Sequence, residues 1–390
     1  MSSLLQELDP KVTSLCEKLA QRADKASELR RVPEESIEDI KQAGLFRLLQ
    51  PKKYGGFEAS PKDFYDVQIR LSTACPSTGW VFGVVGCHAW QMGLFAKEAQ
   101  DEVWQNQDAL ISSSYSPVGK VTLVEGGGYR ISGKWGFSSG SDHCEWAFLG
   151  GLVFTPGEEK PDYRTFLINR EFYEIEDDWY TSGLRGSGSK SIVVRDAYVP
   201  ETHTHRAIDG FIGKNPGNDV NPSPIYRIPF GQVFVRSISS PAIGAAKGAL
   251  NAYLEYNRSR ITSTSRTSAA LDPNVQAIAA EATAEIDAAT LKMHRNFDEI
   301  EEYINSGAEI PLERRYQFRF DSANAVAKCT EVVQKLFVAS GGRAVFTNSP
   351  INRFFQDIHT IKAHVSNNER PLAQNYGAFL MGQKPSDMFI

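Results

Sequence analysis

The chain has 390 residues, of which 41% are hydrophobic and 23% are charged. This balance is typical of a folded protein with a large core and excludes a disordered or membrane-embedded chain. Forty-two lysines and arginines stand against forty-seven aspartates and glutamates, which gives a net charge of -5. Because the basic residues are scattered rather than gathered into a stripe, we expect no nucleic-acid partner.

The cysteines and the N-terminal segment indicate a cytoplasmic location without a membrane partner. The five cysteines are an odd number, widely spaced and without a CxxC motif, which fits reduced thiols rather than disulfides or a zinc site. Residues 1–25 alternate acidic and basic side chains and lack the apolar run of a signal peptide. No stretch approaches 18 uninterrupted apolar residues, the length that a membrane span needs.

Residues 1–108 are expected to form an α-helical domain. The segment 32–51 has Pro33 near a helix start, apolar residues at helical spacing and Gly44 as a stop signal. Residues 61–75 repeat the pattern, and a longer apolar segment follows them. This region carries no strand signal.

Residues 109–215 change to the pattern of a β domain. Short runs rich in β-branched and aromatic residues alternate with Gly, Pro and Asp turns. The runs are 121–137, 145–154, 163–170 and 190–200. They predict a central antiparallel β-barrel.

Residues 216–390 return to helical spacing. Asp272 is an N-cap candidate for a long helix that Gly307 ends, and a second long helix runs from near Leu312 to Gly341. We expect a four-helix bundle here. Helices, then strands, then helices make the fold α+β, because a doubly wound fold would alternate the two kinds of element.

Common cofactor and metal motifs are missing from the sequence. The glycines of residues 183–191 open no helix after a first strand, so a turn is a better interpretation than a dinucleotide site. His203 and His205 lack a third ligand and are expected to face solvent. His359 and His364 are five positions apart, a spacing that puts them on different faces of a helix. We therefore expect no metal site.

Three segments are polar and aromatic where a core would be apolar. Serines at strand ends can offer hydroxyl and N–H groups to a planar heterocycle, and Trp80, Tyr115, Trp135 and Phe137 can wall it. The residues alone leave open an ordinary alternative, in which turn-forming serines lie beside core aromatics. The segments are STGWVFGVVGCHAW, ISSSYSP and GKWGFSSGSDHCEW.

At these segments the sequence resembles the acyl-CoA dehydrogenase superfamily. Within it, the similarity is greatest to the oxygenase components of two-component flavin-dependent aromatic monooxygenases, such as those acting on a seco-steroid phenol or on p-hydroxyphenylacetate. Further family-like segments are LLQPKKYGG, GLRGSGSKSIVVRDAYVP and ASGGRAVFTNSPINRFFQDIHTIKAH. The resemblance implies an N-terminal helical domain, a central β-barrel and a C-terminal four-helix bundle.

One departure from the dehydrogenase pattern favours an oxygenase. Dehydrogenases of this fold commonly place a glutamate base eight positions after an aspartate. Aligning Asp357 with that aspartate puts His364 at the neighbouring tyrosine position and Val365 at the glutamate position. Valine cannot take a proton. An acyl-CoA dehydrogenase remains an alternative, as do oxidation of indole, sulfur or nitrogen and a flavin-fold scaffold without activity.

The resemblance implies that reduced FMN or FAD binds between barrel and bundle, reacts with O2 and forms a C4a-hydroperoxide. A separate NAD(P)H-dependent reductase would supply the flavin. Arg260 would bind the flavin phosphate, and a neighbouring subunit of a homotetramer would supply Gly342 and Arg343. The flavin contacts so implied are Trp80, Ser113, Ser114, Tyr115, Phe137, Ser138, Ser139, Arg260, Gly342, Arg343, His364 and Val365.

Three of the side chains are given catalytic roles by the resemblance and by their chemistry. Ser139 can hydrogen-bond flavin N5, and His364 can accept the proton of a phenol substrate. His88 can hydrogen-bond substrate or peroxide. The plainer alternatives are a helix-capping serine and two histidines satisfied within the core. Steroid-derived phenols, simple phenolic acids and indoles are all compatible substrates.

Overall fold

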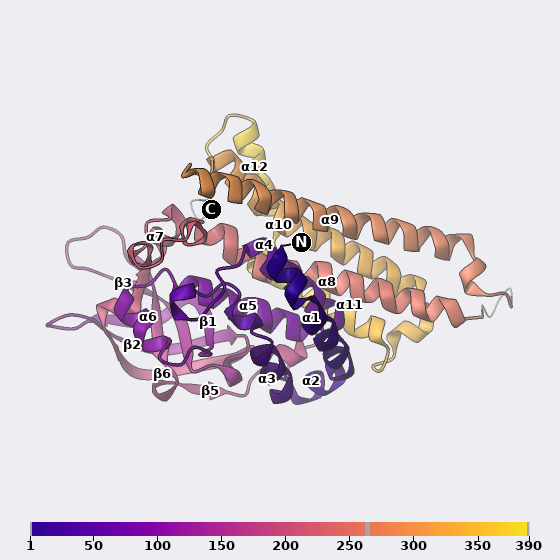
Figure 1. The fold of residues 1–390 in the computed structure, drawn as a ribbon, viewed down its shortest axis with the longest axis horizontal. Helices are drawn as coiled ribbons and strands as arrows, with labels where there is room; N and C mark the ends of the chain where they lie inside the picture. Colours follow the sequence, from indigo (N-terminus) through magenta and orange to yellow (C-terminus); the bar gives the residue numbers. More distant parts are fainter. Residues whose placement is uncertain (1, 262–265, 388–389) are drawn as a thin grey trace.

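The structure is a computed structural model that describes residues 2–261, 266–387 and 390. Helices, strands and long helices follow one another in the predicted order (Figure 1). All regular elements described before residue 109 are helical, as predicted. The α-helices are α1 (Ser3–Gln21), α2 (Ala23–Leu29), α3 (Glu34–Gln42), α4 (Pro61–Ala74), α5 (Pro76–Met92) and α6 (Lys97–Val103).

The middle of the chain forms one sheet of seven strands among the described residues, in the order β5-β6-β2-β1-β3-β4-β7. The order ends in two different edge strands, β5 and β7, so the sheet is not a closed barrel. Most neighbours are antiparallel, but β1 and β3 are parallel, with Ile111 opposite Trp146 and Ser114 opposite Leu149. The strands are β1 (Ile111–Leu123), β2 (Tyr129–Ser138), β3 (Trp146–Val153), β4 (Asp162–Asn169), β5 (Glu174–Glu176), β6 (Lys190–Val199) and β7 (Thr204–Arg206).

The predicted antiparallel barrel is therefore wrong in its closure and in one strand pair. The physical reason is the path from β2 to β3. The turn at Ser141–His143 carries the chain past β1 to its other side. Two reversals in succession give β3 the direction of β1, so the two strands pair in parallel.

The C-terminal part is helical, as predicted. Asp272 caps α9 by accepting a hydrogen bond from the Asn274 N–H, and Gly307 ends that helix with a left-handed backbone. The second predicted helix runs to Ala339, and its C-cap Ser340 directly precedes the glycine pair. The α-helices are α7 (Ala207–Ile212), α8 (Phe230–Ser259), α9 (Pro273–Ser306), α10 (Leu312–Ala339), α11 (Pro350–Ala363) and α12 (Glu369–Leu380).

Helix α8 joins the two helical parts. It packs against α9, α10 and α11 on one side and against α4 and α5 on the other. A Cβ at Gly244 would lie 2.5 Å from the Ile69 carbonyl oxygen, so only glycine permits this approach of α8 to α4. The long helices therefore do not form an isolated unit, and the domain boundaries after residues 108 and 215 stay predictions.

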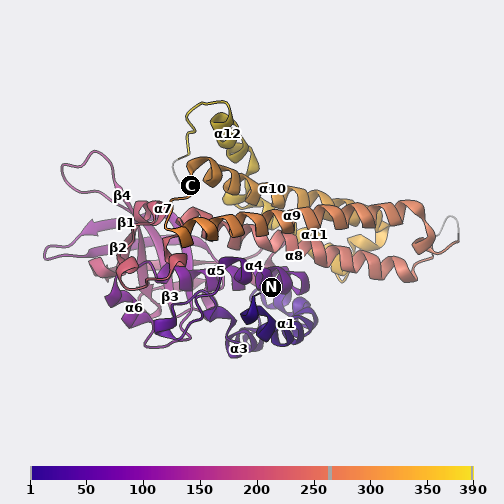
Figure 2. The same ribbon diagram turned by 45° about the horizontal axis from the view of Figure 1, so that its top comes forward.

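The molecule is elongated because α8, α9 and α10 run side by side away from the sheet (Figures 1 and 2). The N-terminal helices α4 and α5 lie between the sheet and these long helices. No helix in the described part of the chain has the length and apolar character to cross a membrane.

Candidate active site

A cavity of about 970 Å³ lies where α5, β1, the end of β2, the segment before β6 and α11 meet. Its volume is at the upper end of the range for small-molecule sites. The residues that line it are Trp80, Val84, Ser113, Ser114, Tyr115, Ser116, Gly136, Phe137, Ser139, Trp179, Thr181, Ser182, Leu184, Ser189, Phe234, Ile238, His359, Thr360, Ala363, His364, Val365 and Ser366.

Eight of the residues predicted to contact flavin line this one cavity. Ser138 does not: it is fully buried behind the wall, and its Oγ has no hydrogen-bond partner among the described residues. The eight are Trp80, Ser113, Ser114, Tyr115, Phe137, Ser139, His364 and Val365.

His88 is buried behind the cavity wall rather than at its surface. Its ring stacks on Phe234 and meets the edge of Tyr115, both of which line the cavity. Nδ1 lies 2.5 Å from the Ile111 carbonyl oxygen and donates to it, while burial lowers the pKa of the imidazole to about 4. The structure therefore does not bring His88 to the substrate space that the sequence analysis gave it.

Arg260, Gly342 and Arg343 lie together, but far from the cavity of their own chain. Arg260 caps the end of α8 and its Nη1 donates to the Ser340 carbonyl oxygen at 3.5 Å, directly beside the glycine pair. Ile238 lines the cavity near the other end of α8. Roughly six helical turns separate it from Arg260, about 33 Å along the axis. Within one chain, Arg260 is therefore well separated from the part of the cavity that Ile238 lines.

A chain of hydroxyl groups reaches the cavity through Ser139. Trp80 Nε1 donates to Ser139 Oγ at 2.9 Å, Ser139 Oγ lies 2.7 Å from Ser189 Oγ, and Ser189 Oγ lies 2.7 Å from Ser187 Oγ. When Ser187 donates to Ser189 and Ser189 donates to Ser139, every buried proton has an acceptor and Ser139 turns its own proton to the cavity. Because hydroxyls rotate, the reverse direction offers a lone pair there instead.

An aromatic wall closes another side of the cavity. Phe137 has a left-handed backbone, with φ of 65°, and the residue is 76% exposed. Its ring meets that of Trp179 edge to face, with 6.1 Å between centroids. A non-glycine residue held in this backbone region costs free energy, and such strain concentrates at functional sites.

Helix α11 holds the loop that carries Trp179. Asp357 accepts a hydrogen bond from the Leu184 N–H at 2.6 Å, and Trp179 Nε1 donates to the Leu184 carbonyl oxygen at 3.0 Å. Burial raises the pKa of the Asp357 carboxyl to about 6. At Gly183 a Cβ would lie 2.0 Å from the Gln356 carbonyl oxygen, so the loop lies directly on α11.

His364 stands at the junction between α11 and the short turn of Val365–Asn367. Its Nδ1 accepts a hydrogen bond from the Ser366 N–H at 3.1 Å, and its ring lies 5.8 Å from that of Trp80. Burial and the Arg319 guanidinium lower the pKa of the imidazole to about 4. The adjacent Val365 is 82% exposed.

His203 and His205 correct another expectation, because both are buried instead of facing solvent. His203 Nε2 lies 3.0 Å from a Glu102 carboxylate oxygen, and His205 Nε2 lies 2.9 Å from the Asn215 side-chain oxygen. Each is satisfied by a neighbour. In the part of the chain that the structure describes, no three His, Cys, Asp or Glu side chains are placed to hold a metal ion.

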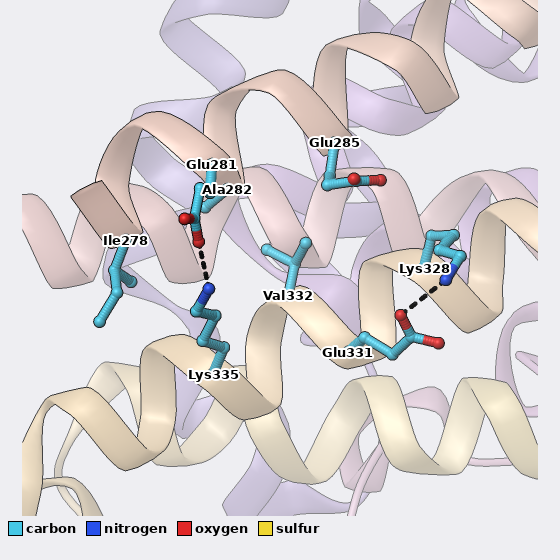
Figure 3. Close-up of a pocket in the computed structure, with 8 residues that line it drawn as sticks. All are labelled: Ile278, Glu281, Ala282, Glu285, Lys328, Glu331, Val332 and Lys335. Carbon is cyan, nitrogen blue, oxygen red and sulfur yellow. Dashed lines mark hydrogen bonds and ion pairs between the residues drawn. The ribbon is translucent and has the colours of Figure 1, made fainter.

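A second hollow lies between α9 and α10 and has a volume of about 250 Å³ (Figure 3). Two ion pairs line it, Lys335 with Glu281 and Lys328 with Glu331, and Glu285 adds a further carboxylate. No aromatic or histidine side chain lines it. This hollow therefore lacks the groups that the large cavity offers to a heterocycle.

Comparison with known proteins shows to which family this chain belongs. Models of the acyl-CoA dehydrogenase N-terminal and C-terminal domains match residues 6–107 and 236–369. The chain is 37% identical to oxygenase subunit HsaA of the flavin-dependent monooxygenase of Rhodococcus jostii RHA1, over 99% of this chain and 100% of that protein. It is 34% identical to the oxygenase component of p-hydroxyphenylacetate 3-hydroxylase from Acinetobacter baumannii, over 97% and 90% of the two chains.

A solved structure shows the same relationship in three dimensions. The crystal structure of 3-HSA hydroxylase from Rhodococcus sp. RHA1 superposes with a TM-score of 0.94 at 36% identity, covering 98% of this chain and 99% of that one. The chain is a flavin-dependent monooxygenase of the acyl-CoA dehydrogenase family. The resemblance stated from the sequence motifs is thereby confirmed.

The cavity of the monooxygenase fits a flavin. Trp80, Phe137 and Trp179 offer apolar and aromatic surface, which a planar ring system requires. Along one edge the hydroxyl of Ser139, which hydrogen-bonds to Ser189, reaches the cavity. Polar groups in these places can orient a heterocycle.

Several residues that line the cavity of the monooxygenase were not predicted from the sequence. Trp179, Thr181 and Ser182 directly precede the family-like segment that begins at Gly183, and their aromatic and hydroxyl character was the available signal. Ser189 lies inside that segment but was taken only as part of a turn. Arg319 does not line the cavity but lowers the pKa of His364, and the sequence gave no signal for it, because an arginine on a helix usually faces solvent.

Proposed function

We propose that the monooxygenase hydroxylates a phenolic or related aromatic substrate with O2 and reduced flavin. The observation that carries this proposal is that the cavity has no acidic side chain: no aspartate or glutamate among the described residues lines it. A dehydrogenase needs a base to remove the α-proton of an acyl thioester, and Val365 stands where that base is expected. Histidines, serines and aromatic rings suit a neutral aromatic substrate better.

Bound reduced FMN or FAD would supply the activation of O2. Trp80, Phe137 and Trp179 would hold its ring system and exclude water from one side. Ser139 would hydrogen-bond at the polar edge of the ring, with its rotation set by Ser189 and Ser187. Ser113, Ser114 and Tyr115 would add polar contacts from β1.

His364 would contact the hydroxyl group of the phenol. It borders the same cavity as Ser139, and its ring is near Trp80. His88 would act only indirectly, by supporting Tyr115 and Phe234 from behind. In this proposal His364 is the side chain that contacts the reacting substrate.

The proposed partners are a separate NAD(P)H-dependent flavin reductase and further copies of this chain. The word subunit or component in the names of the two relatives supports a reductase encoded separately. A homotetramer would place Arg260, Gly342 and Arg343 of one chain at the cavity of another, which resolves their distance from their own cavity. Each chain of this homotetramer would contain the three proposed domains, 1–108, 109–215 and 216–390.

A substrate panel tests the proposal. The purified chain, chemically reduced FMN or FAD and O2 would be mixed with simple phenols, phenolic acids, a steroid phenol, indole, a thioether and an amine. We expect oxygenated product from at least one phenol, scored by mass spectrometry rather than by oxygen uptake. Product from indole, the thioether or the amine alone would move the proposal to that substrate class. Anaerobic bleaching of oxidised flavin by an acyl-CoA would support a dehydrogenase instead.

A further inference from the structure

The segment of residues 177–184, called the Trp179 loop below, supplies Trp179, Thr181, Ser182 and Leu184 to the wall of the cavity. Two helices that are far apart in the sequence contact it. Helix α11 holds the C-terminal end of the loop, and the end of α2 contacts its N-terminal half. No described residue of α2 lines the cavity, so this second contact supports the cavity wall from outside.

The guanidinium of Arg30, directly after α2, makes three kinds of contact with the Trp179 loop. Nη1 and Nη2 donate to the two carboxylate oxygens of Asp177 at 2.8 and 2.5 Å. Nη1 also donates to the Trp179 carbonyl oxygen at 3.3 Å, and the guanidinium carbon lies 3.9 Å from the centroid of the Tyr180 ring. Only arginine combines a planar fork of donors with stacking on a ring, so lysine could not make all three contacts.

The backbone of Arg30 is held firmly at the same place. Its φ of 54° is left-handed, which is uncommon for a residue other than glycine. A Cβ at Gly188 would lie 3.1 Å from the Arg30 carbonyl oxygen, and one at Gly186 would lie 2.9 Å from Ala26 Cβ. The last turn of α2 therefore packs closely on the segment that follows the Trp179 loop, and the side chain of Arg30 extends from a fixed support.

Trp179 depends on such supports because its other contacts are local. Its Nε1 donates to the Leu184 carbonyl oxygen within the same loop, and its ring meets that of the exposed Phe137. Asp178 is fixed to β6, where it accepts hydrogen bonds from the Ser191 N–H at 3.0 Å and from Ser191 Oγ at 2.6 Å. Of the hydrogen bonds that come from described residues outside the loop, only that of Arg30 reaches the main chain of Trp179.

We propose that Arg30 is a positioning residue of the flavin site, which holds Trp179 against the ring system of the bound flavin. The inference rests on the proposed function, because it requires the flavin ring to lie in this cavity. The ion pair with Asp177 would contribute little by itself, since the Asp177 side chain is 52% exposed and surface ion pairs are weak. The contact with Trp179 is what connects Arg30 to the cavity, because a wall that is held in place before binding retains its ligand better.

The release of reduced flavin tests this role without substrate or O2. The full-length chain would be loaded anaerobically with reduced FMN, or with reduced FAD in a separate run. It would then be mixed with excess cytochrome c, which takes electrons from flavin that has left the protein. Arg30→Gln should release both flavins about five- to tenfold faster, the effect of roughly one lost hydrogen bond. Arg30→Lys keeps the charge but loses the planar fork, so its rate should lie between the two.

Arg195→Gln is the matched control variant. Arg195 donates to both carboxylate oxygens of Glu174 at 3.2 and 3.0 Å, in an exposed ion pair like that of Arg30, but neither residue lines the cavity or belongs to the Trp179 loop. Its flavin release should match that of the native chain. Unchanged release from a folded Arg30→Gln chain, or an equal increase in Arg195→Gln, would overturn the inference.

A double-mutant cycle separates positioning from general structural support. If Arg30 acts through Trp179, Arg30→Gln should change the release rate by about twofold or less in a chain that already carries Trp179→Ala. Two effects that simply multiply would refute the positioning role. A thermal unfolding scan shows whether each variant folds, and Asp177→Asn, which alters the exposed partner of Arg30, replaces Arg30→Gln in the cycle if that variant does not. A native chain that retains neither reduced flavin would contradict the proposed function itself, which is a distinguishable result.

Discussion

At the scale of single residues, the hydroxyl of Ser139 is the group whose loss should separate flavin binding from peroxide control. Ser139→Ala removes one hydrogen bond, so flavin affinity should fall by no more than about tenfold. The polar edge of the ring loses its partner at the same time, so more H2O2 should form for each reduced flavin oxidised. Flavin binding by fluorescence and peroxide yield, measured on the same preparation, check this. An unchanged peroxide yield would count against the role.

Ser189 should show a weaker form of the same effect, because it contacts Ser139 at 2.7 Å and sets its rotation. In Ser189→Ala the peroxide yield should lie between the values for the native chain and for Ser139→Ala. Ser182→Ala is a matched control, since Ser182 lines the same cavity but is not part of this hydroxyl chain. Equal effects of Ser182→Ala and Ser189→Ala would argue for general polarity rather than a directed chain.

At the scale of elements, the contact between α11 and the loop at Gly183 should make stability depend on pH through Asp357. Burial raises the pKa of this carboxyl to about 6, from an ordinary value near 4. The folded chain therefore binds this proton more tightly than the unfolded chain. Its contribution to stability is greatest below about pH 4, declines as the pH rises to about 6, and is constant above that, a change of roughly 3 kcal/mol at most.

Asp357→Asn should remove this dependence while keeping an acceptor for the Leu184 N–H. The unfolding free energy of the variant minus that of the native chain should increase by about 1–3 kcal/mol between pH 4 and pH 7, measured by denaturant titration. Glu302→Gln, an exposed change on α9, serves as the control and should show no such trend. A difference for Asp357→Asn that is flat or declines with pH would contradict the proposed linkage.

Elements also show what a sequence can and cannot predict. The caps at Asp272 and Gly307 are local signals, and they placed α9 correctly. The parallel pairing of β1 with β3 depends on which side of β1 the chain passes after the turn at Ser141–His143, and no local pattern encodes that choice. In the same way, family motifs predicted the cavity serines, whereas the contact of Arg319 with Ser366 joins two distant segments and could not be predicted.

At the scale of the whole molecule, the separation of Arg260 and Arg343 from the cavity leads to a prediction about assembly. If a second copy supplies these residues, the native mass should be a multiple of the 43.3 kDa chain, and we expect four copies. Arg343→Ala should weaken flavin binding without changing the residues of its own cavity. Light scattering after size exclusion and flavin titration measure the two effects. A monomer that binds flavin as tightly as the native preparation would contradict the shared site.

The absence of a dinucleotide motif from the sequence leads to a second expectation for the whole molecule. The purified chain alone should not oxidise NADH, and addition of a flavin reductase should give turnover. Absorbance at the NADH band, followed with and without the reductase, checks this. Sustained NADH-dependent hydroxylation by the chain alone would show a nicotinamide site that the sequence analysis missed.

The central claim is that this chain inserts an atom of O2 into an aromatic ring when reduced flavin is supplied from outside. The most direct measurement mixes the chain with chemically reduced flavin, a phenol found active in the panel and ¹⁸O2, with neither NADH nor reductase present. The account predicts hydroxylated product that carries one ¹⁸O atom per hydroxyl added. Product oxygen derived from water, or complete oxidation of the flavin to H2O2 without product from any aromatic tested, would contradict it.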